Sequence, residues 1–594
     1  MTAHLLLVTL GPVQDFIAQA RRTRDLWYGS HLLSELGRAA ARALVAGGAD
    51  LIFPAPKKGH AELEVCSAPL RSDGTPPLSI ANKLLAEIPA GVDPIELARN
   101  ARGAVMAHWR DKLAAPVRAT CVGLLAEGID PTWNEQIDTF VEFAAIWAPL
   151  GDYAETRRRI ERTIAGRKML RDFSPWKHGR GAVPKSSLDG GRETVLRRKE
   201  DRDKSLVRRY RIHKNEELDA VGLVKRAGGE PDQFVPVVSV ALASWVGVAH
   251  GVASAEFGRL RDACKEAGIS RVARTDLPCV GPFPFDASVL LPSRWRSVFE
   301  EQGLEGNAEA WGRQHVQPIL KKVPEPYPYV ACLVADGDRM GRAIDRLASA
   351  GEHRAFSEAL SQLARQARTI VEQTHRGALV YAGGDDVLAF LPLPEALLCA
   401  QDLRIQFTQA MGSACPSIPA EQRPTLSVGL GLGHVMESMG DLLVLGREAE
   451  REAKRDRNAL AVLVDKRSGG ARSWRSSWDE EPVRLLRDSA VLLEGRLPSR
   501  KVHEVASTLA RLPAPVSADD SAWTRLLALE VRRSLSRIEG GALSPEDAGL
   551  ALDERSDYAV LHARVHAWVA RMLVARTFAQ ANPQPRKRHE EAAV

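Results

Sequence analysis

The clearest pattern of apolar and polar positions lies in the second half of the chain, where an uninterrupted apolar run, YVACLVA, occupies 329–335. Such a run predicts a strand buried on both faces of a sheet. Helical spacing follows over about 342–375, and ALVYAGGDDVLAFLPL at 378–393 predicts two strands around a four-residue turn. The next expected elements are a helix at 395–411, a strand at 425–435, a helix at 442–455 and a strand at 458–465. This order contains the β-α-β-β-α-β unit of a ferredoxin-like or palm domain.

The N-terminal part opens with a similar alternation. LLLVTL at 5–10 predicts a buried strand, and Gly11-Pro12 predicts a turn into a helix that reaches about residue 27. A second helix is expected over about 30–45, followed by a short strand at LIFPAP, 51–56, which prolines end. This strand–helix–strand opening predicts an α/β domain.

The other segments are mainly helical in pattern. Helical spacing dominates 80–170, and the Trp and Phe residues of 133–147 are expected in the core rather than on a ligand platform. Residues 174–232 are rich in Gly, Pro and charge and predict loops. A mostly helical segment then runs to about residue 322, and only helical patterning follows 473, before a polar tail that we expect to fray.

These patterns predict a multidomain α/β (α+β) protein with an N-terminal α/β domain, a helical insert, a ferredoxin-like palm domain and a C-terminal helical bundle; that the N-terminal domain is also a palm, giving two ferredoxin-like palm domains, is what a family resemblance implies. The proline-rich sequence PEPYP at 324–328 marks one boundary. The expected domains are a first palm-like domain with helical and basic-loop insertions at 1–235, a mostly helical linking domain at 236–325, a second palm domain at 326–470 and a C-terminal helical domain at 471–594.

Composition agrees with a folded protein of several cores, because 594 residues exceed what one hydrophobic core supports and 45% of them are hydrophobic. The net charge of +6 permits a nucleic-acid partner without requiring one. The basic residues are concentrated in 192–214, which holds ten Lys or Arg against four Asp or Glu. This stretch is either a solvated loop or a surface for nucleic acid or a protein neighbour.

The cysteines and the N-terminus exclude several classes of protein. Seven cysteines are scattered, their number is odd and no C-x-x-C occurs, so we expect neither disulfides nor a zinc site. The N-terminus has no basic region before its short apolar run, which does not fit a signal peptide. No apolar stretch approaches the roughly 20 residues of a membrane span. We therefore expect a cytoplasmic protein.

Two acidic motifs carry the candidate chemistry. Asp336-Gly337-Asp338 follows the apolar strand, and Gly383-Gly384-Asp385-Asp386 forms the turn of the hairpin. In a palm fold these two places are neighbours, so the carboxylates converge at one edge of the sheet. Clustered carboxylates require a cation, and their oxygens suit Mg²⁺ or Mn²⁺ shared with substrate phosphates. We expect Asp336, Asp385 and Asp386 to hold two metal ions that activate an attacking hydroxyl and stabilise a leaving pyrophosphate, as in nucleotidyl transfer.

Each motif also has a structural interpretation. Asp-Asp in a Gly-Gly turn is common hairpin chemistry, and Asp338 is the weakest candidate because it can serve as a turn-capping residue. The glycines Gly337, Gly383 and Gly384 are expected to let the backbone approach a triphosphate. Lys454, at the end of the last palm helix, either reaches a phosphate or is an exposed lysine favoured by the helix dipole. Both acidic motifs lie on the two connections that a palm fold brings together, which favours a metal and nucleotide site over the structural interpretation.

With these residues in place, the chain resembles the large polymerase/cyclase-like subunit of type III CRISPR effector complexes, Cmr type (III-B-like). ADGDRMG, YAGGDD, the strand with His434 and AKRDRN resemble its second palm domain. GPVQDFIAQARRTRDLWYGSHLLSEL resembles its first palm domain, and so do the sequences at 184–196 and 216–226. The resemblance runs from residue 1 to about 470. It implies two facing palm domains, synthesis of cyclic oligoadenylates from ATP when the complex binds foreign RNA, and partners comprising other subunits, crRNA and target RNA.

The sequence departs from that family in two ways. No His is followed by Asp, so the HD nuclease domain found in many members and its DNA cleavage are expected to be absent. The counterpart of the family's zinc knuckle is Ser186-Ser187-Leu188-Asp189, which lacks thiols.

Three functions stay open. They are an RNA-activated oligoadenylate synthetase in a ribonucleoprotein, a non-catalytic scaffold of that complex, and a cyclase-like enzyme that makes another nucleotide product. The intact set of three carboxylates favours catalysis over a scaffold, because a structural role does not require converging acids.

Overall fold

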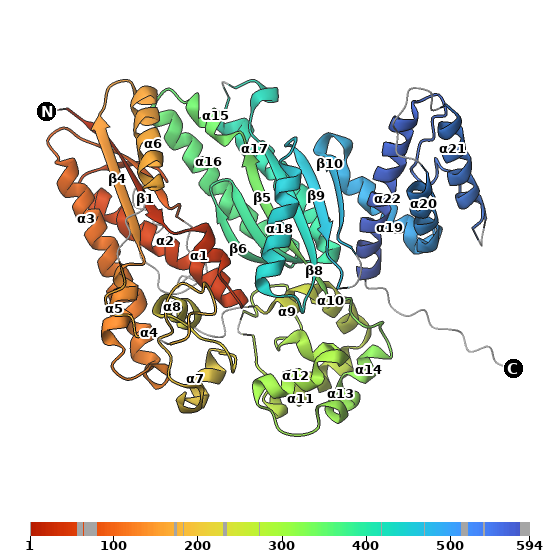
Figure 1. Cartoon of the computed structure of the whole chain (residues 1–594), viewed down its shortest axis with the longest axis horizontal. Helices are drawn as coiled ribbons and strands as arrows, with labels where there is room; N and C mark the ends of the chain where they lie inside the picture. The colour runs from red at the N-terminus through yellow and green to blue at the C-terminus, as the bar shows by residue number, and fades with distance from the viewer. Residues whose placement is uncertain are drawn as a thin grey trace.

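The computed structural model describes residues 2–55, 63, 80–170, 175–181, 183–229, 235–272, 274–416, 418–467, 470–512, 521–538 and 541–582. Two sheets with their helices lie side by side, and a helical domain lies below the second sheet (Figure 1). A bundle of C-terminal helices forms the end of the molecule opposite to the first sheet. Cys66, Pro56 and the tail from residue 583 lie outside the described residues.

The first sheet is antiparallel and has the order β2-β3-β1-β4. Its strands are β1 (His4–Gly11), β2 (Asp50–Phe53), β3 (Lys83–Ile88) and β4 (Glu142–Pro149). The helices around it are α1 (Gln14–Ala18), α2 (Thr23–Ala46), α3 (Pro94–Ala107), α4 (Ala115–Thr120), α5 (Asp130–Asp138) and α6 (Tyr153–Met169). Helices α2 and α3 join the strands in the β-α-β-β-α-β order of a ferredoxin-like domain.

Helices make up most of 80–170, as expected, but two strands that were not expected interrupt them. β3 and β4 lie in this segment and pair with β1 on both of its sides. Only the start of 133–147 is helical, since α5 ends at Asp138 and β4 begins at Glu142. Pairing with β1, whose six central residues are buried, overrides the local helical spacing.

The second sheet has the order β10-β9-β8-β5-β7-β6. Its strands are β5 (Tyr329–Asp338), β6 (Ala378–Gly383), β7 (Asp386–Pro392), β8 (Thr425–His434), β9 (Ala459–Val464) and β10 (Arg472–Ser477). Helices α15 (Met340–Asp345), α16 (Ala350–Arg368), α17 (Leu393–Ala414) and α18 (Met439–Ala453) connect them. The mixed α/β fold with two palm-like sheets is thus confirmed. β10 corrects the expectation of helix alone after about residue 473.

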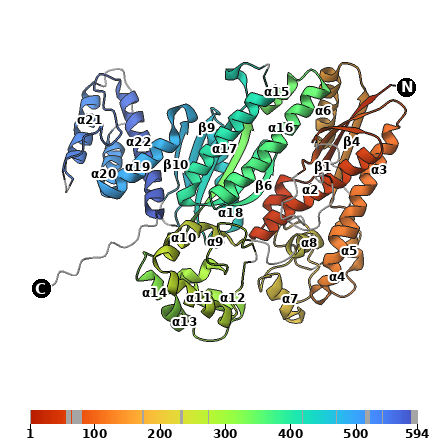
Figure 2. The same ribbon diagram turned by 180° about the vertical axis from the view of Figure 1, so that it is seen from behind.

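Helices cover both faces of this sheet. α18 lies on one face in Figure 1, whereas α16 and α17 lie on the other face, seen from behind in Figure 2. β5 is central, and its residues Val330, Cys332 and Leu333 are all fully buried. The apolar run is therefore covered by helices on both faces of the sheet, which confirms the predicted central strand.

Glycines set the close packing of α18 on β8. A Cβ at Gly429 would lie 2.1 Å from the backbone nitrogen of Glu450, and one at Gly431 would lie 2.5 Å from that of Gly446. On the helix side, a Cβ at Gly446 would lie 2.7 Å from the sulfur of Cys332. No side chain fits at these positions, so the glycines fix the helix against the sheet.

The segment 174–232 is not only loop. It contains α7 (Lys204–Arg209) and α8 (Ala220–Ala227), and α8 is fully buried. Ser186, expected at a lost zinc knuckle, donates a hydrogen bond to Asp219, which caps α8. The linking segment that follows is helical, as expected. Its helices are α9 (Val237–Ala241), α10 (Ala243–Val252), α11 (Ser254–Ala267), α12 (Trp295–Gln302), α13 (Ala308–His315) and α14 (Gln317–Leu320).

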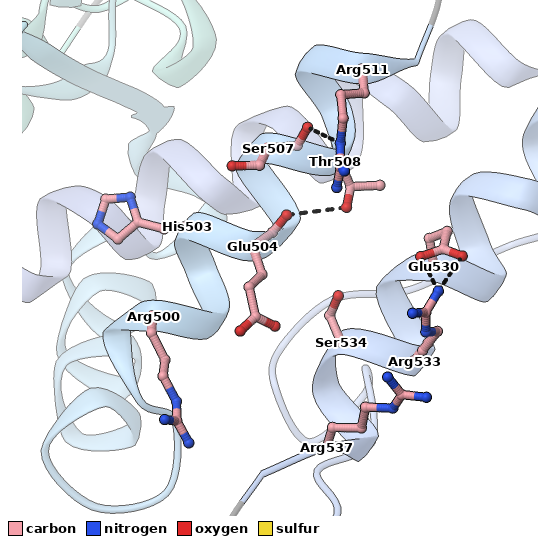
Figure 3. A pocket seen from close by; sticks show the side chains of 10 residues that line it. All are labelled: Arg500, His503, Glu504, Ser507, Thr508, Arg511, Glu530, Arg533, Ser534 and Arg537. Carbon is pink, nitrogen blue, oxygen red and sulfur yellow. Dashed lines mark hydrogen bonds and ion pairs between the residues drawn. The ribbon is translucent and has the colours of Figure 1, made fainter.

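The C-terminal helices form a bundle. Residues between 497 and 572 enclose a hydrophobic core of their own, whereas the buried residues of 483–490 and 574–578 belong to the core of the second sheet. They are α19 (Pro482–Gly495), α20 (Ser499–Arg511), α21 (Ser521–Ser536) and α22 (Tyr558–Ala581). A hollow of about 520 Å³ opens between α20 and α21 (Figure 3). Among the residues that the structure describes, no helix combines the length and the apolar character needed to cross a membrane.

Candidate metal and nucleotide site

Strand register brings the two acidic motifs together at one edge of the second sheet. β5 and β7 are antiparallel neighbours, with Ala335 opposite Val387. Asp336 and Asp386 are the next residues along these strands, so they lie beside each other. Gly383 pairs with Asp386, which leaves Gly384 and Asp385 as the two central residues of a four-residue turn. Gly384 has a φ of 68°, a value that glycine adopts without strain.

Three carboxylates form a compact cluster. One oxygen from each of Asp336, Asp385 and Asp386 lies within 4.8 Å of the other two, and the side chains are half-buried. Within the described part of the chain, this is the one group of His, Cys, Asp and Glu side chains with such geometry. All-oxygen donors at this spacing suit a hard divalent cation such as Mg²⁺ or Mn²⁺.

Repulsion among the three carboxylates is only partly compensated by neighbouring charge. Burial and the neighbouring Asp336 raise the pKa of Asp385 to about 6. Burial, Asp385 and Asp336 together raise the pKa of Asp386 to about 8. Lys454 opposes these shifts and only reduces them. A divalent cation would remove the mutual repulsion that causes part of these shifts, so the donor set fits a bound metal.

Lys454 reaches the cluster from the end of α18. Its ammonium group pairs with Asp336 and lies 3.4 Å from Glu450, one helical turn earlier. Burial alone would lower the pKa of Lys454, but these two carboxylates outweigh it and raise the pKa. Lys454 therefore stays charged beside the carboxylate cluster.

Glu450 is a site residue that the sequence reading missed. Burial raises the pKa of Glu450, and Asp336 adds to that shift while Lys454 opposes it. The i, i+4 spacing of Glu450 and Lys454 on a helix was visible in the sequence. The sequence did not show that glycines let α18 pack closely on β8. This packing places Glu450 and Lys454 at the edge of the sheet.

The three expected glycines differ in their surroundings. A Cβ at Gly337 would lie 2.8 Å from the Cβ of Asp385, so glycine is needed for the turn to approach β5. A Cβ at Gly383 would lie 2.3 Å from the hydroxyl of Tyr381, which donates a hydrogen bond to the Gly383 carbonyl. Gly384 alone of the three has no atom within 4 Å of its Cβ position. It is the glycine at which a ligand can approach the backbone.

Asp338 has a structural role, consistent with its position as the weakest candidate. It is 2% exposed and accepts hydrogen bonds from Thr425 and Ser427 at 2.8 and 2.9 Å. It also accepts one from the backbone nitrogen of Asn458 at 3.0 Å. Asp338 thus ties β5 to β8 and to the loop before β9, which leaves its oxygens engaged.

Adding Mg²⁺ or Mn²⁺ is expected to raise the melting temperature of the protein, because a ligand that binds only the folded state stabilises it by about 2.7 kcal/mol at a hundred times its Kd. The metal must displace protons from Asp385 and Asp386, whose pKa values are raised. The shift should therefore be small at pH 5.5 and grow toward pH 8. Thermal unfolding with and without metal checks this, and a shift that is largest at pH 5.5 would contradict it.

Two family models match parts of this chain. The family model "Cas10/Cmr2, second palm domain" matches residues 329–461, which include the acidic cluster and Lys454. The model "CRISPR-associated protein Cmr2, N-terminal" matches residues 5–114. The CRISPR system Cmr subunit Cmr2 of Pyrococcus furiosus is 25% identical over 565 residues, which cover 78% of this chain. This chain spans 62% of the length of that relative.

Solved structures show the same fold. A type III-B Cmr-beta cryo-EM structure in the apo state aligns with a TM-score of 0.61 over 97% of this chain and 82% of that one. The Cmr-beta structure bound to cognate target RNA aligns with a TM-score of 0.60 over 97% and 83% of the two chains. Sequence identity is 13% in both cases, so these likenesses concern the fold alone.

Proposed function

We propose that this chain, a Cmr-type Cas10 large subunit by its two matched domains, joins ATP-derived nucleotides into cyclic oligoadenylates at the Asp336–Asp385–Asp386 cluster. The observation that carries the proposal is the convergence of three carboxylates within 4.8 Å at the edge of a palm sheet. The raised pKa values of Asp385 and Asp386 support the proposal, because perturbed carboxylates of this kind cluster at functional sites.

Each residue of the site has a distinct part in this proposal. Asp336, Asp385 and Asp386 would hold two divalent cations, which in such sites activate an attacking hydroxyl and stabilise the leaving pyrophosphate. Lys454 would bind a phosphate group, and Glu450 holds its ammonium group in position. The open backbone at Gly384 would lie against the triphosphate. Gly337 serves the site by letting the turn approach β5, and Gly383 leaves room for the Tyr381 hydroxyl.

We further propose that the chain works within a type III complex with other protein subunits, crRNA and target RNA. One structural neighbour is described as bound to cognate target RNA. The C-terminal bundle, in which residues 497–572 enclose a core of their own, is the part that we expect to dock another subunit.

The test is mass spectrometry of the products that the reconstituted complex makes from ATP, Mg²⁺ and target RNA. We expect cyclic adenylate oligomers that depend on both the metal and the RNA. Products that form without RNA, from the chain alone, would favour a free-standing cyclase. No nucleotide product under any activating RNA would favour the scaffold.

A further inference from the structure

Lys454 occupies a place that a metal ion and a phosphate group would both approach. Its ammonium group pairs with Oδ2 of Asp336, an oxygen of the carboxylate cluster. Within the described part of the chain, Lys454 is the one cationic side chain that forms an ion pair with any of the three clustered aspartates. It therefore supplies positive charge to a carboxylate that a metal ion needs as a ligand.

The charge of Lys454 acts on the whole cluster. Burial and the neighbouring aspartates raise the pKa values of Asp385 and Asp386, and Lys454 lowers both. A divalent cation on these oxygens would meet the ammonium group as a like charge at close range, and such repulsion costs free energy. Lys454 and a metal ion at Asp336 are therefore competitors as long as the ammonium group keeps this position.

The ammonium group of Lys454 has a second partner and is able to move. Glu450, one helical turn earlier, lies 3.4 Å from it. The side chain of Lys454 is 32% exposed, and lysine carries its charge on a flexible stem. Lys454 can therefore leave Asp336 and still remain at the edge of the site.

The backbone around Lys454 is fixed, so this movement involves the side chain alone. α18 ends directly before Lys454 and packs on the glycines of β8, on the face of the sheet that Figure 1 shows. Asp456 pairs with Arg475 of β10 at 3.0 Å. The backbone nitrogen of Asn458 donates a hydrogen bond to the buried Asp338. These contacts hold the chain on both sides of Lys454.

We propose that Lys454 couples metal binding to nucleotide binding, because its ammonium group blocks Asp336 to a metal ion until the phosphates of ATP draw it away. This inference rests on the proposed function, which makes a metal ion and a triphosphate the ligands of the cluster. A triphosphate carries more negative charge than one carboxylate, and an ammonium group binds phosphate strongly. Once Lys454 pairs with a phosphate, both oxygens of Asp336 are available to metal ions.

The coupling acts in both directions. If the nucleotide raises the affinity of the cluster for metal, the metal raises the affinity for the nucleotide by the same factor. The site therefore fills with nucleotide and metal together, and it binds metal weakly when the nucleotide is not bound.

Two simpler roles of Lys454 lead to different expectations. A lysine that only binds phosphate has no influence on metal affinity measured without nucleotide. A lysine that only holds Asp336 in position for the metal gives a lower metal affinity when it is removed. The coupling predicts a higher metal affinity and a lower nucleotide affinity, so the signs of the two changes separate the three roles.

Binding of Mn²⁺ to the full chain without nucleotide, followed by electron paramagnetic resonance of the free ion, tests the proposal without any reaction. A pH of about 8.5, above the pKa values of Asp385 and Asp386, keeps proton competition low. In the variant Lys454→Met, the Kd for Mn²⁺ should fall on the order of tenfold, because one like charge is removed from beside the cation. The Kd for a fluorescent ATP analogue, measured in EDTA, should rise on the order of tenfold in the same variant.

Two further variants serve as controls. Lys454→Arg keeps the charge, so its Kd for Mn²⁺ should stay within about threefold of the wild-type value. Lys322→Met removes a lysine that pairs with Glu256 at 3.0 Å outside the cluster, and it should change neither Kd by more than about twofold. A Kd for Mn²⁺ that stays the same or rises in Lys454→Met would overturn the proposal. If Lys454→Met does not fold, Lys454→Gln also removes the charge and is judged by the same outcomes.

Failure of the coupling and failure of the proposed function give different results. Tighter Mn²⁺ binding in Lys454→Met, together with a wild-type complex that makes no nucleotide product, would support the coupling and refute oligoadenylate synthesis. Normal product from the wild-type complex, with unchanged Mn²⁺ affinity in Lys454→Met, would refute the coupling alone. A wild-type chain and a variant that both fail to bind Mn²⁺ would refute the two together.

Discussion

Replacing Asp385 and Asp386 by alanine is expected to lower nucleotide joining by the complex on the order of a thousandfold or more. Together with Asp336, these residues supply the oxygen ligands of the cluster, and one oxygen from each lies within 4.8 Å of the others. Without them the cations that act on the hydroxyl and the triphosphate have one carboxylate left. Product formation from ATP, quantified by mass spectrometry or chromatography, measures the loss.

The matched control for this variant is Asp262→Ala/Asp488→Ala, which removes two exposed carboxylates outside the cluster. It should keep full activity. RNA binding should be unchanged in both variants, because affinity for RNA comes from basic residues. A near-normal rate in the Asp385→Ala/Asp386→Ala variant would show that the site is misassigned.

The stability of the Asp385→Ala/Asp386→Ala variant without metal distinguishes a catalytic role of these aspartates from a structural one. The raised pKa values of Asp385 and Asp386 mean that the folded state holds more protons than the unfolded state between about pH 4 and pH 8. Wild-type stability should therefore fall as pH rises through this window, and the variant should lose that dependence. A large drop in its melting temperature would mean that these aspartates maintain the turn instead.

The sequence was sufficient for the features that depend on local pattern. The apolar run of β5 predicted a central strand because both faces of that strand are buried. The Gly-Gly-Asp-Asp turn predicted its hairpin because turn chemistry is local. The place of the carboxylates then followed from the topology, since β5 and β7 are neighbours in a palm sheet.

Features that depend on distant pairing were missed for a physical reason. β3 and β4 were expected to be helical, and they form strands because β1 offers both of its edges. Glu450 gains its position from glycine contacts between α18 and β8.

A buried charge network was also invisible in the sequence, although it holds the first palm domain to its insertion. Arg226 of α8 is fully buried and donates hydrogen bonds to Asp25 of α2 and to Glu216. Burial alone would raise the pKa of Asp25 and of Glu216, but Arg226 reverses both shifts and lowers the pKa of each. One guanidinium therefore compensates two buried carboxylates from distant segments.

Replacing Arg226 by methionine is expected to destabilise the protein by about 3–5 kcal/mol, the usual cost of removing one partner from a buried ion pair. Two carboxylates would be left uncompensated, so their pKa values should rise above the unfolded values. The loss in free energy of unfolding relative to wild type should then be largest near pH 7. It should shrink toward pH 4, where the carboxylates can accept protons. Denaturant unfolding at several pH values measures this loss of stability.

The control Arg99→Met, at an exposed arginine of α3, should change stability by less than about 0.5 kcal/mol. A deficit for Arg226→Met that matches this control, or that grows as the pH falls, would mean that packing rather than charge compensation holds α8 against α2.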